Sequence, residues 1–80
     1  MPNLSSQRQD PTLIAIGGAI RRIRKHRKLS QEKLALLAEV DPSYLGRVER
    51  GDNAPAILTL KKLADSLEVS MSELMEEAGL

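Results

Sequence analysis

The chain has 80 residues, enough for one small domain, and a chain of this size buries only about 60% of the surface that it exposes when unfolded. The absence of cysteine and the single histidine exclude disulfide and thiolate chemistry and disfavour a metal site, so idealised helix packing or self-association is left to stabilise the fold. The net charge of +1 hides an uneven distribution. Residues 1–50 carry ten basic and five acidic side chains, whereas residues 51–80 carry two basic and six acidic ones. The excess of positive charge in residues 1–50 predicts a polyanionic partner for that part of the chain.

Residues 1–11 are polar, include two prolines and lack helical periodicity. We expect them to form a flexible N-terminal tail, followed by a folded domain over residues 12–80. No apolar run approaches the roughly 18–20 residues that a membrane span needs, and no signal-peptide pattern opens the chain. The expected protein is therefore soluble and cytoplasmic, with no membrane partner.

The first predicted helix begins near Thr12, because apolar residues follow at helical spacing: Leu13, Ile16, Ile20 and Ile23. Gly17 and Gly18 each weaken a helix by about 1 kcal/mol relative to alanine, so one of them is expected to allow close packing. The run RRIRKHRK over residues 21–28 suits general attraction to a polyanion, direct phosphate contact by Arg27 or Lys28, or a solvated helix face.

Two short helices are predicted next, separated by a link of residues 39–41. Ser30 is a candidate N-cap for the first of them. Asp41 and Pro42 provide the N-cap and the first helical position of the second, which ends at Gly51. So short a link forces the helices to cross steeply, as in a helix-turn-helix, whose second helix can enter a DNA major groove about 12 Å wide.

A fourth helix is predicted from the apolar residues Ile57, Leu60, Leu63, Ala64 and Leu67. A fifth helix follows Ser70, which forms a capping-box pattern with Glu73 three residues later. Five short helices without strand signals make the chain all-α.

Three segments resemble a known family. Residues 29–35 read LSQEKLA, Ala38 and Val40 follow, and residues 43–51 read SYLGRVERG. They resemble the Cro/cI-type, Xre-like helix-turn-helix family, and the similarity extends over about residues 13–74. The resemblance implies an all-α, compact five-helix lambda-repressor-like fold that binds DNA. The short chain and residues 41–45 also resemble the controller proteins of restriction–modification systems.

The resemblance implies roles for matching residues. The recognition helix, about residues 42–50, would place Ser43, Tyr44 and Arg47 against base edges, and Gly46 would let it sit close to the groove. A guanidinium such as that of Arg47 can bind guanine O6 and N7 together. The alternative role for Arg47 is a surface ion pair with Glu49 or Asp52, and the alternative role for Tyr44 is partial core packing. The implied phosphate contacts are Gln31, Arg50 and Asn53. The alternative for Gln31 is an ordinary residue of the first helical turn, and for Arg50 and Asn53 it is solvated surface.

The resemblance also implies a structural ion pair between Arg24 and Glu49.

Two positions depart from the family pattern. Glu39 stands where glycine is common, which costs about 1 kcal/mol if that residue needs a positive φ. Ala56 stands where a Ser or Thr cap is common. Leu36 is predicted on the outer face of its helix, either covered by the tail through Leu4 or part of an apolar contact patch.

One recognition helix reads only a few base pairs, so we expect a homodimer that presents two of them about 34 Å apart to a palindromic, inverted-repeat operator. The expected dimer interface consists of Met71, Leu74, Met75 and Leu80. The alternative is that these residues cover the core under the fifth helix, which applies above all to Leu74. The predicted function is sequence-specific regulation of transcription, by blocking RNA polymerase or by touching it. The alternative is an antitoxin-like or adaptor protein that acts through a protein partner. The residues suggest no catalytic site, cofactor or metal site, so we expect no enzyme.

Overall fold

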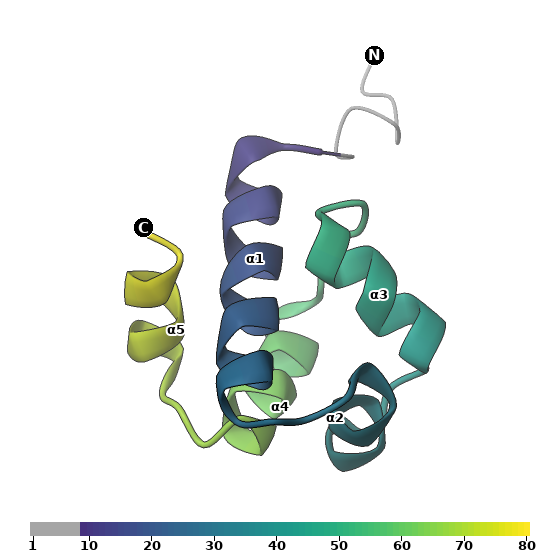
Figure 1. Cartoon of the computed structure of the whole chain (residues 1–80). Coiled ribbons are helices and arrows are strands. Elements are labelled where there is room, and N and C mark those ends of the chain that lie inside the picture. Colours follow the sequence, from purple (N-terminus) through teal and green to yellow (C-terminus); the bar gives the residue numbers. More distant parts are fainter. Residues whose placement is uncertain (1–8) are drawn as a thin grey trace.

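The computed structural model describes residues 9–80. Its helices are α1 (Pro11–His26), α2 (Gln31–Ala38), α3 (Pro42–Arg50), α4 (Ile57–Ser66) and α5 (Met71–Glu77), and this part of the chain contains no strand. α1 packs against α3 on one side and α5 on the other, while α2 packs against α3 and α4 (Figure 1). The all-α, five-helix prediction is confirmed. No helix between residues 9 and 80 is both long and apolar enough to cross a membrane.

The helices begin where short polar side chains accept backbone N–H groups. Ser30 and Asp41 cap α2 and α3, and Ser70 forms the predicted capping box with Glu73. α1 begins one residue earlier than expected, at Pro11, because the Asp10 carboxylate accepts the N–H of Thr12. Residues 1–8 of the expected tail lie outside the described residues. Ala56 provides no side-chain cap for α4, as its alanine side chain requires.

All five helices end in the same backbone arrangement. A residue with φ between 60° and 83° follows each helix, and the N–H of the next residue returns to a carbonyl five residues earlier at 2.9 or 3.0 Å, which is the Schellman motif. The positive-φ residues are Lys28, Glu39, Gly51, Glu68 and Gly79. Three of them are not glycine. Glu39 does have a positive φ, so the strain expected in that case is present. The same strain applies at Lys28 and Glu68, which the sequence pattern did not reveal.

The core is aliphatic and is formed by all five helices. The largest fully buried side chains are Ile20, Leu34, Leu45, Val48, Leu63, Leu67 and Leu74. Ile57 lies in α4 as predicted, but it does not join the buried apolar stripe of the helix: this first residue is 73% exposed, and its neighbour Leu58 is 77% exposed. The stripe is buried only from Leu60 onward, where α4 packs against α2 and α5.

One glycine allows α1 to approach α3. A Cβ atom placed on Gly17 would lie 2.2 Å from the carbonyl oxygen of Val48 and 2.7 Å from that of Glu49, so no side chain fits there. A Cβ on Gly18 would meet only the flexible end of Arg22, at 3.2 Å. The expectation that one of the two glycines permits close packing is confirmed, and that glycine is Gly17.

Candidate nucleic-acid interface

The outer face of α3 carries the residues that the sequence predicted for base contacts. Ser43 and Arg47 are exposed, whereas Tyr44 is half-buried and packs against the core. The Arg47 guanidinium carbon lies 6.0 Å from the centroid of the Tyr44 ring, at the limit of a cation–π contact. The three side chains thus share the first two turns of α3, and Tyr44 combines a structural role with an accessible edge.

The Asp41 carboxylate fixes the start of this face. Its Oδ1 accepts the backbone N–H of Ser43 at 2.9 Å and the Ser43 hydroxyl at 3.0 Å. These hydrogen bonds, with a smaller contribution from the charge of Arg47, lower the pKa of Asp41 below its usual value of 3.8. A carboxylate that stays ionised at neutral pH therefore holds Ser43 at the tip of the helix.

The alternative ion pairs of Arg47 do not form among the described residues, because both carboxylates have other partners. Glu49 binds Arg24, and Asp52 lies 3.3 Å from Arg50. The Arg47 guanidinium is therefore left at the surface, where it can approach an external ligand.

Two of the predicted phosphate-contacting residues are neighbours across Gly46. A Cβ placed on this buried glycine would lie 3.4 Å from Nη1 of Arg50 and 3.7 Å from Oε1 of Gln31. Gly46 is therefore covered by these two side chains, and a Cβ there would make only ordinary contacts with their flexible ends. That Gly46 lets the helix sit close to a groove stays a prediction. Asn53 lies apart from them, half-buried in the loop after α3.

A buried polar network joins three helices behind this surface. Nε and Nη2 of Arg24 on α1 donate to the two carboxylate oxygens of Glu49 on α3, at 2.7 and 3.0 Å. The remaining nitrogen of Arg24 donates to the carbonyl of Leu29 at 2.9 Å, and Nε2 of Gln31 on α2 donates to Glu49 at 2.9 Å. The side chains of Arg24 and Glu49 are only 8% and 2% exposed. The two residues expected to pair therefore lie together in a fully bonded cluster.

Sequence reasoning missed a contact between Gln9 and the end of α3. Its backbone N–H donates to the carbonyl of Gly51 at 2.8 Å, and its side-chain amide donates to the carbonyl of Arg50 and to the carboxylate of Asp52. It thereby ties the chain before α1 to the end of α3. No signal in the sequence could have found this contact, because Gln9 lies in a polar stretch without periodicity.

The basic run of residues 21–28 divides between two sides of α1. Arg22 and Arg27 form ion pairs with Glu77 and Glu68, at 2.9 and 2.8 Å, and Arg24 is buried. These pairs draw Arg22 and Arg27 toward the acidic C-terminal part of the chain. Exposed residues Arg21, Lys25 and Lys28 remain for attraction to a polyanion, and the phosphate contact considered for Arg27 competes with its ion pair.

The predicted dimer residues differ in their surroundings. Leu74 is completely buried within the single chain, so its side chain belongs to the core, as the alternative expected, and not to a dimer interface. Met71 and Met75 are half-buried, and Leu80 is 59% exposed.

Sequence reasoning missed Ile57 and Leu58 as exposed aliphatic residues, whereas Leu36 is exposed as expected. Within residues 9–80, no cluster of three or more His, Cys, Asp or Glu could hold a metal ion.

Residues 20–74 match the helix-turn-helix family, and the chain belongs to this family of DNA-binding domains. It is 37% identical over 67 residues to the immunity repressor protein of Bacillus phage phi105. This match covers 84% of this chain and 46% of that protein. The chain spans about half the length of several curated relatives that it matches.

Solved structures show the same fold. The restriction-modification controller protein C.AhdI from Aeromonas hydrophila is 40% identical, with a TM-score of 0.76, and the match covers 78% of this chain and 94% of that one. The clp gene regulator ClgR from Corynebacterium glutamicum is 28% identical, with a TM-score of 0.83, over 85% of this chain and 72% of that one. The recognised family and its structural neighbours therefore agree with the helix arrangement described above.

Proposed function

We propose that the protein is a sequence-specific transcriptional regulator that acts in the cytoplasm and inserts α3 into the DNA major groove. The observation that carries this proposal is the exposed face of Ser43, Tyr44 and Arg47 at the start of the second helix of a helix-turn-helix. The N-terminal residues of such a helix contact base edges. The repressor and controller names among the similar proteins support the same function.

Phosphate contacts position the recognition helix on either side of its base contacts. Gln31, at the first position of α2, and Arg50, at the end of α3, meet beside Gly46 and can approach one phosphate together. Asn53, in the loop after α3, would add a further phosphate contact. The N-terminus of α2 adds backbone N–H groups and a dipole that favours an anion.

The regulator acts as a homodimer on an inverted-repeat operator, because two recognition helices one DNA turn apart multiply the affinity of one. The interface includes Met71, Met75 and Leu80, and the exposed pair Ile57 and Leu58 adds aliphatic area to it. A bound dimer represses by excluding RNA polymerase from the promoter and activates when a free face touches the polymerase.

The test is selection of binding sites from random DNA, followed by affinity measurements on a recovered site. An enriched inverted repeat is expected. Arg47→Ala should reduce discrimination at one base pair by about 1–3 kcal/mol, while the fold is retained. Lys62→Ala, which removes an exposed charge on α4, is the control and should leave discrimination unchanged. Absence of any enriched sequence would overturn the proposal.

A second candidate is an antitoxin-like or adaptor protein. The observation that favours it is the exposure of Leu36 and Leu37 on α2, of which Leu36 is 70% exposed. In this case the α2 face binds a protein partner, and Leu36→Lys abolishes that complex. Site selection separates the two candidates, because an adaptor enriches no DNA sequence of its own.

A further inference from the structure

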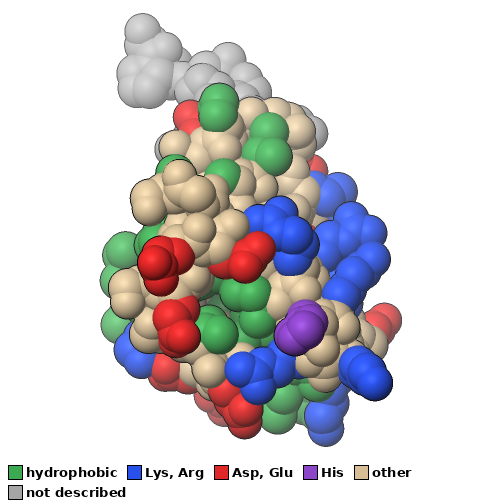
Figure 2. All heavy atoms as spheres, turned by 60° about the vertical axis from the view of Figure 1, so that its left-hand side comes forward, with side chains coloured by type: hydrophobic (Ala, Val, Ile, Leu, Met, Phe, Trp, Pro, Cys, Tyr) green, Lys and Arg blue, Asp and Glu red, His purple; other side chains and the backbone are tan. Residues whose placement is uncertain are grey.

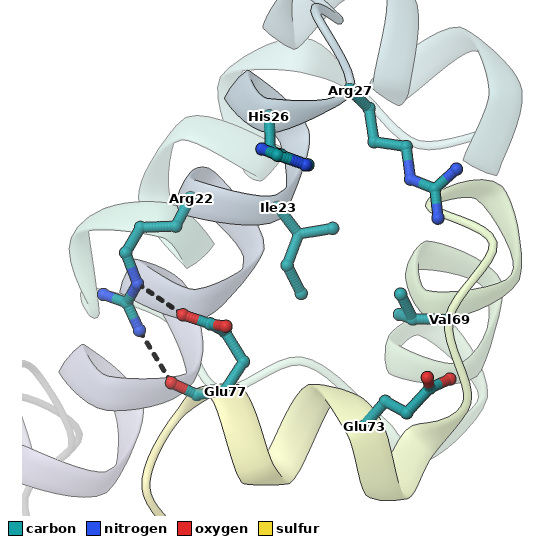
Figure 3. Close-up of a pocket in the computed structure, with 7 residues that line it drawn as sticks. All are labelled: Arg22, Ile23, His26, Arg27, Val69, Glu73 and Glu77. Carbon is teal, nitrogen blue, oxygen red and sulfur yellow. Dashed lines mark hydrogen bonds and ion pairs between the residues drawn. The ribbon is translucent and has the colours of Figure 1, made fainter.

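A groove of about 440 Å³ lies between α1 and α5, on the side of α1 that faces away from α3 (Figures 2 and 3). It is lined by Arg22, Ile23, His26, Arg27, Val69, Glu73 and Glu77. Its volume falls within the range of small-molecule sites, which is roughly 300–1,000 Å³. None of these residues belongs to the DNA-facing surface described above.

The two walls of the groove carry opposite charge. Arg22, His26 and Arg27 come from α1 and its end, and Glu73 and Glu77 come from α5 (Figure 3). Between the walls, half-buried Ile23 and Val69 pack against the core and form an aliphatic floor.

Ion pairs close both ends of the groove and hold its walls in place. Nε of Arg22 lies 2.9 Å from Glu77, and its Nη2 donates to the carbonyl of the same residue at 2.8 Å. At the other end Nη1 of Arg27 lies 2.8 Å from Glu68.

The middle of the groove offers one polar group on each wall. The structure gives His26 no hydrogen bond or ion pair among residues 9–80. Opposite it, one oxygen of the Glu73 carboxylate accepts the N–H of Ser70 at 2.7 Å. This hydrogen bond, with a smaller contribution from the charge of Arg27, lowers the pKa of Glu73 below its usual value of 4.5, so Glu73 is ionised at neutral pH.

These charges select one kind of occupant. Because Arg22 and Glu77 largely neutralise each other, the repulsion comes from Glu73 for a purely anionic molecule and from Arg27 for a purely cationic one. A molecule with one charge of each sign on an aliphatic body complements both walls and the floor. We propose that the groove between α1 and α5 binds a small zwitterion of the amino-acid type with a branched aliphatic side chain. Its carboxylate faces His26 and Arg27, and its ammonium group faces Glu73 and Glu77.

Titration of ¹⁵N-labelled protein at neutral pH, followed by NMR, tests this site with L-leucine as the probe. Saturable shifts are expected at backbone amides of the lining residues, with a Kd on the order of 1–10 mM for so small a ligand. 4-Methylpentanoate lacks the ammonium group, 3-methylbutylamine lacks the carboxylate, and glycine lacks the side chain. Each of these analogues should bind at least tenfold more weakly.

Two tryptophan variants locate the binding. His26→Trp places an indole over the floor of the groove and should weaken leucine binding at least tenfold. Lys25→Trp changes the adjacent exposed residue, which does not line the groove, and should leave binding unchanged. The proposal is overturned by an absence of saturable shifts, by shifts outside the groove, by equal binding of a singly charged analogue, or by equal binding to the folded His26→Trp variant. The analogue series on the unaltered chain decides the matter if that variant does not fold.

Discussion

At the scale of single residues, the two adjacent glycines of α1 have opposite requirements. Gly17 faces the backbone of α3, where a Cβ would lie 2.2 Å from a carbonyl oxygen, and Gly18 faces a flexible arginine. The same substitution at these neighbouring positions therefore separates the cost of close packing from the helix propensity of alanine.

Gly17→Ala should destabilise the protein by about 1–3 kcal/mol, because α1 must move away from α3. Gly18→Ala should stabilise it by about 0.5–1 kcal/mol through helix propensity. Urea denaturation of the two variants measures both effects. Equal effects of the two substitutions would contradict the assignment of the contact to Gly17.

A second residue-scale prediction concerns the buried ion pair. Glu49→Ala leaves the Arg24 guanidinium buried without its carboxylate, which should cost about 3–5 kcal/mol and unfold the domain before it alters DNA specificity. The control is Glu68→Ala, which removes the exposed partner of Arg27 and should cost less than about 1 kcal/mol. Thermal denaturation compares them, and a Glu49→Ala variant as stable as wild type would refute the structural role.

At the scale of elements, the helix ends determine where the chain turns. Glu39 at the end of α2 has φ of 60°, which costs a residue with a Cβ about 1 kcal/mol relative to glycine. Glu39→Gly should therefore stabilise the protein by about that amount in urea denaturation. Glu32→Gly, at an exposed right-handed position of the same helix, should instead destabilise it by about 0.5–1 kcal/mol.

The helix starts predict a pH dependence. The pKa of Asp41 is lowered in the folded state, chiefly by the Ser43 N–H. Its contribution to stability is therefore complete above the usual value of 3.8 and is lost as the pH falls through the lower folded value. Asp41→Asn keeps a capping oxygen but does not titrate. Urea denaturation from neutral to strongly acidic pH should show a smaller loss for this variant than for wild type, and parallel losses would contradict the role of the carboxylate.

The helix starts were more predictable from the sequence than the helix ends, for a physical reason. Ser30, Asp41 and Ser70 signal a helix start because their side chains accept the exposed N–H groups. Lys28 and Glu68 give no such signal, since positive φ at a charged residue has no side-chain signature. The apolar residue that follows each of them, Leu29 or Val69, is the available indication of a Schellman motif.

The contacts of the candidate site could not be predicted from the sequence. The resemblance to the helix-turn-helix family singled out Arg24 and Glu49 as a pair, and Gln31 and Arg47 as DNA contacts. The hydrogen bond from Gln31 to Glu49 and the approach of Gln31 to Arg50 depend on how α2 and α3 cross, which single-sequence periodicity does not specify. The burial of Leu74 depends likewise on the packing of α5.

At the scale of the whole molecule, the proposed homodimer depends on exposed aliphatic residues. Leu80→Glu and Ile57→Glu change exposed residues, so the single chain should remain folded while the dimer dissociates at least tenfold more readily. Leu36→Glu, on the exposed face of α2, is the control and should leave the dimer intact. Sedimentation equilibrium measures the effect. A dimer disrupted only by Leu36→Glu would place the interface on α2 instead.

The network around Glu49 also bears on how such a protein acquires a new target sequence. One carboxylate on α3 holds α1 through Arg24 and α2 through Gln31, whereas Ser43 and Arg47 are exposed and lie outside this cluster. Of the three proposed base-contacting residues, Ser43 and Arg47 are therefore separate from this framework, whereas Tyr44 also packs against the core. If Ser43 and Arg47 contact bases as proposed, mutations at these two positions should change the preferred DNA sequence at little cost in folding, so that specificity can diverge while the scaffold is kept.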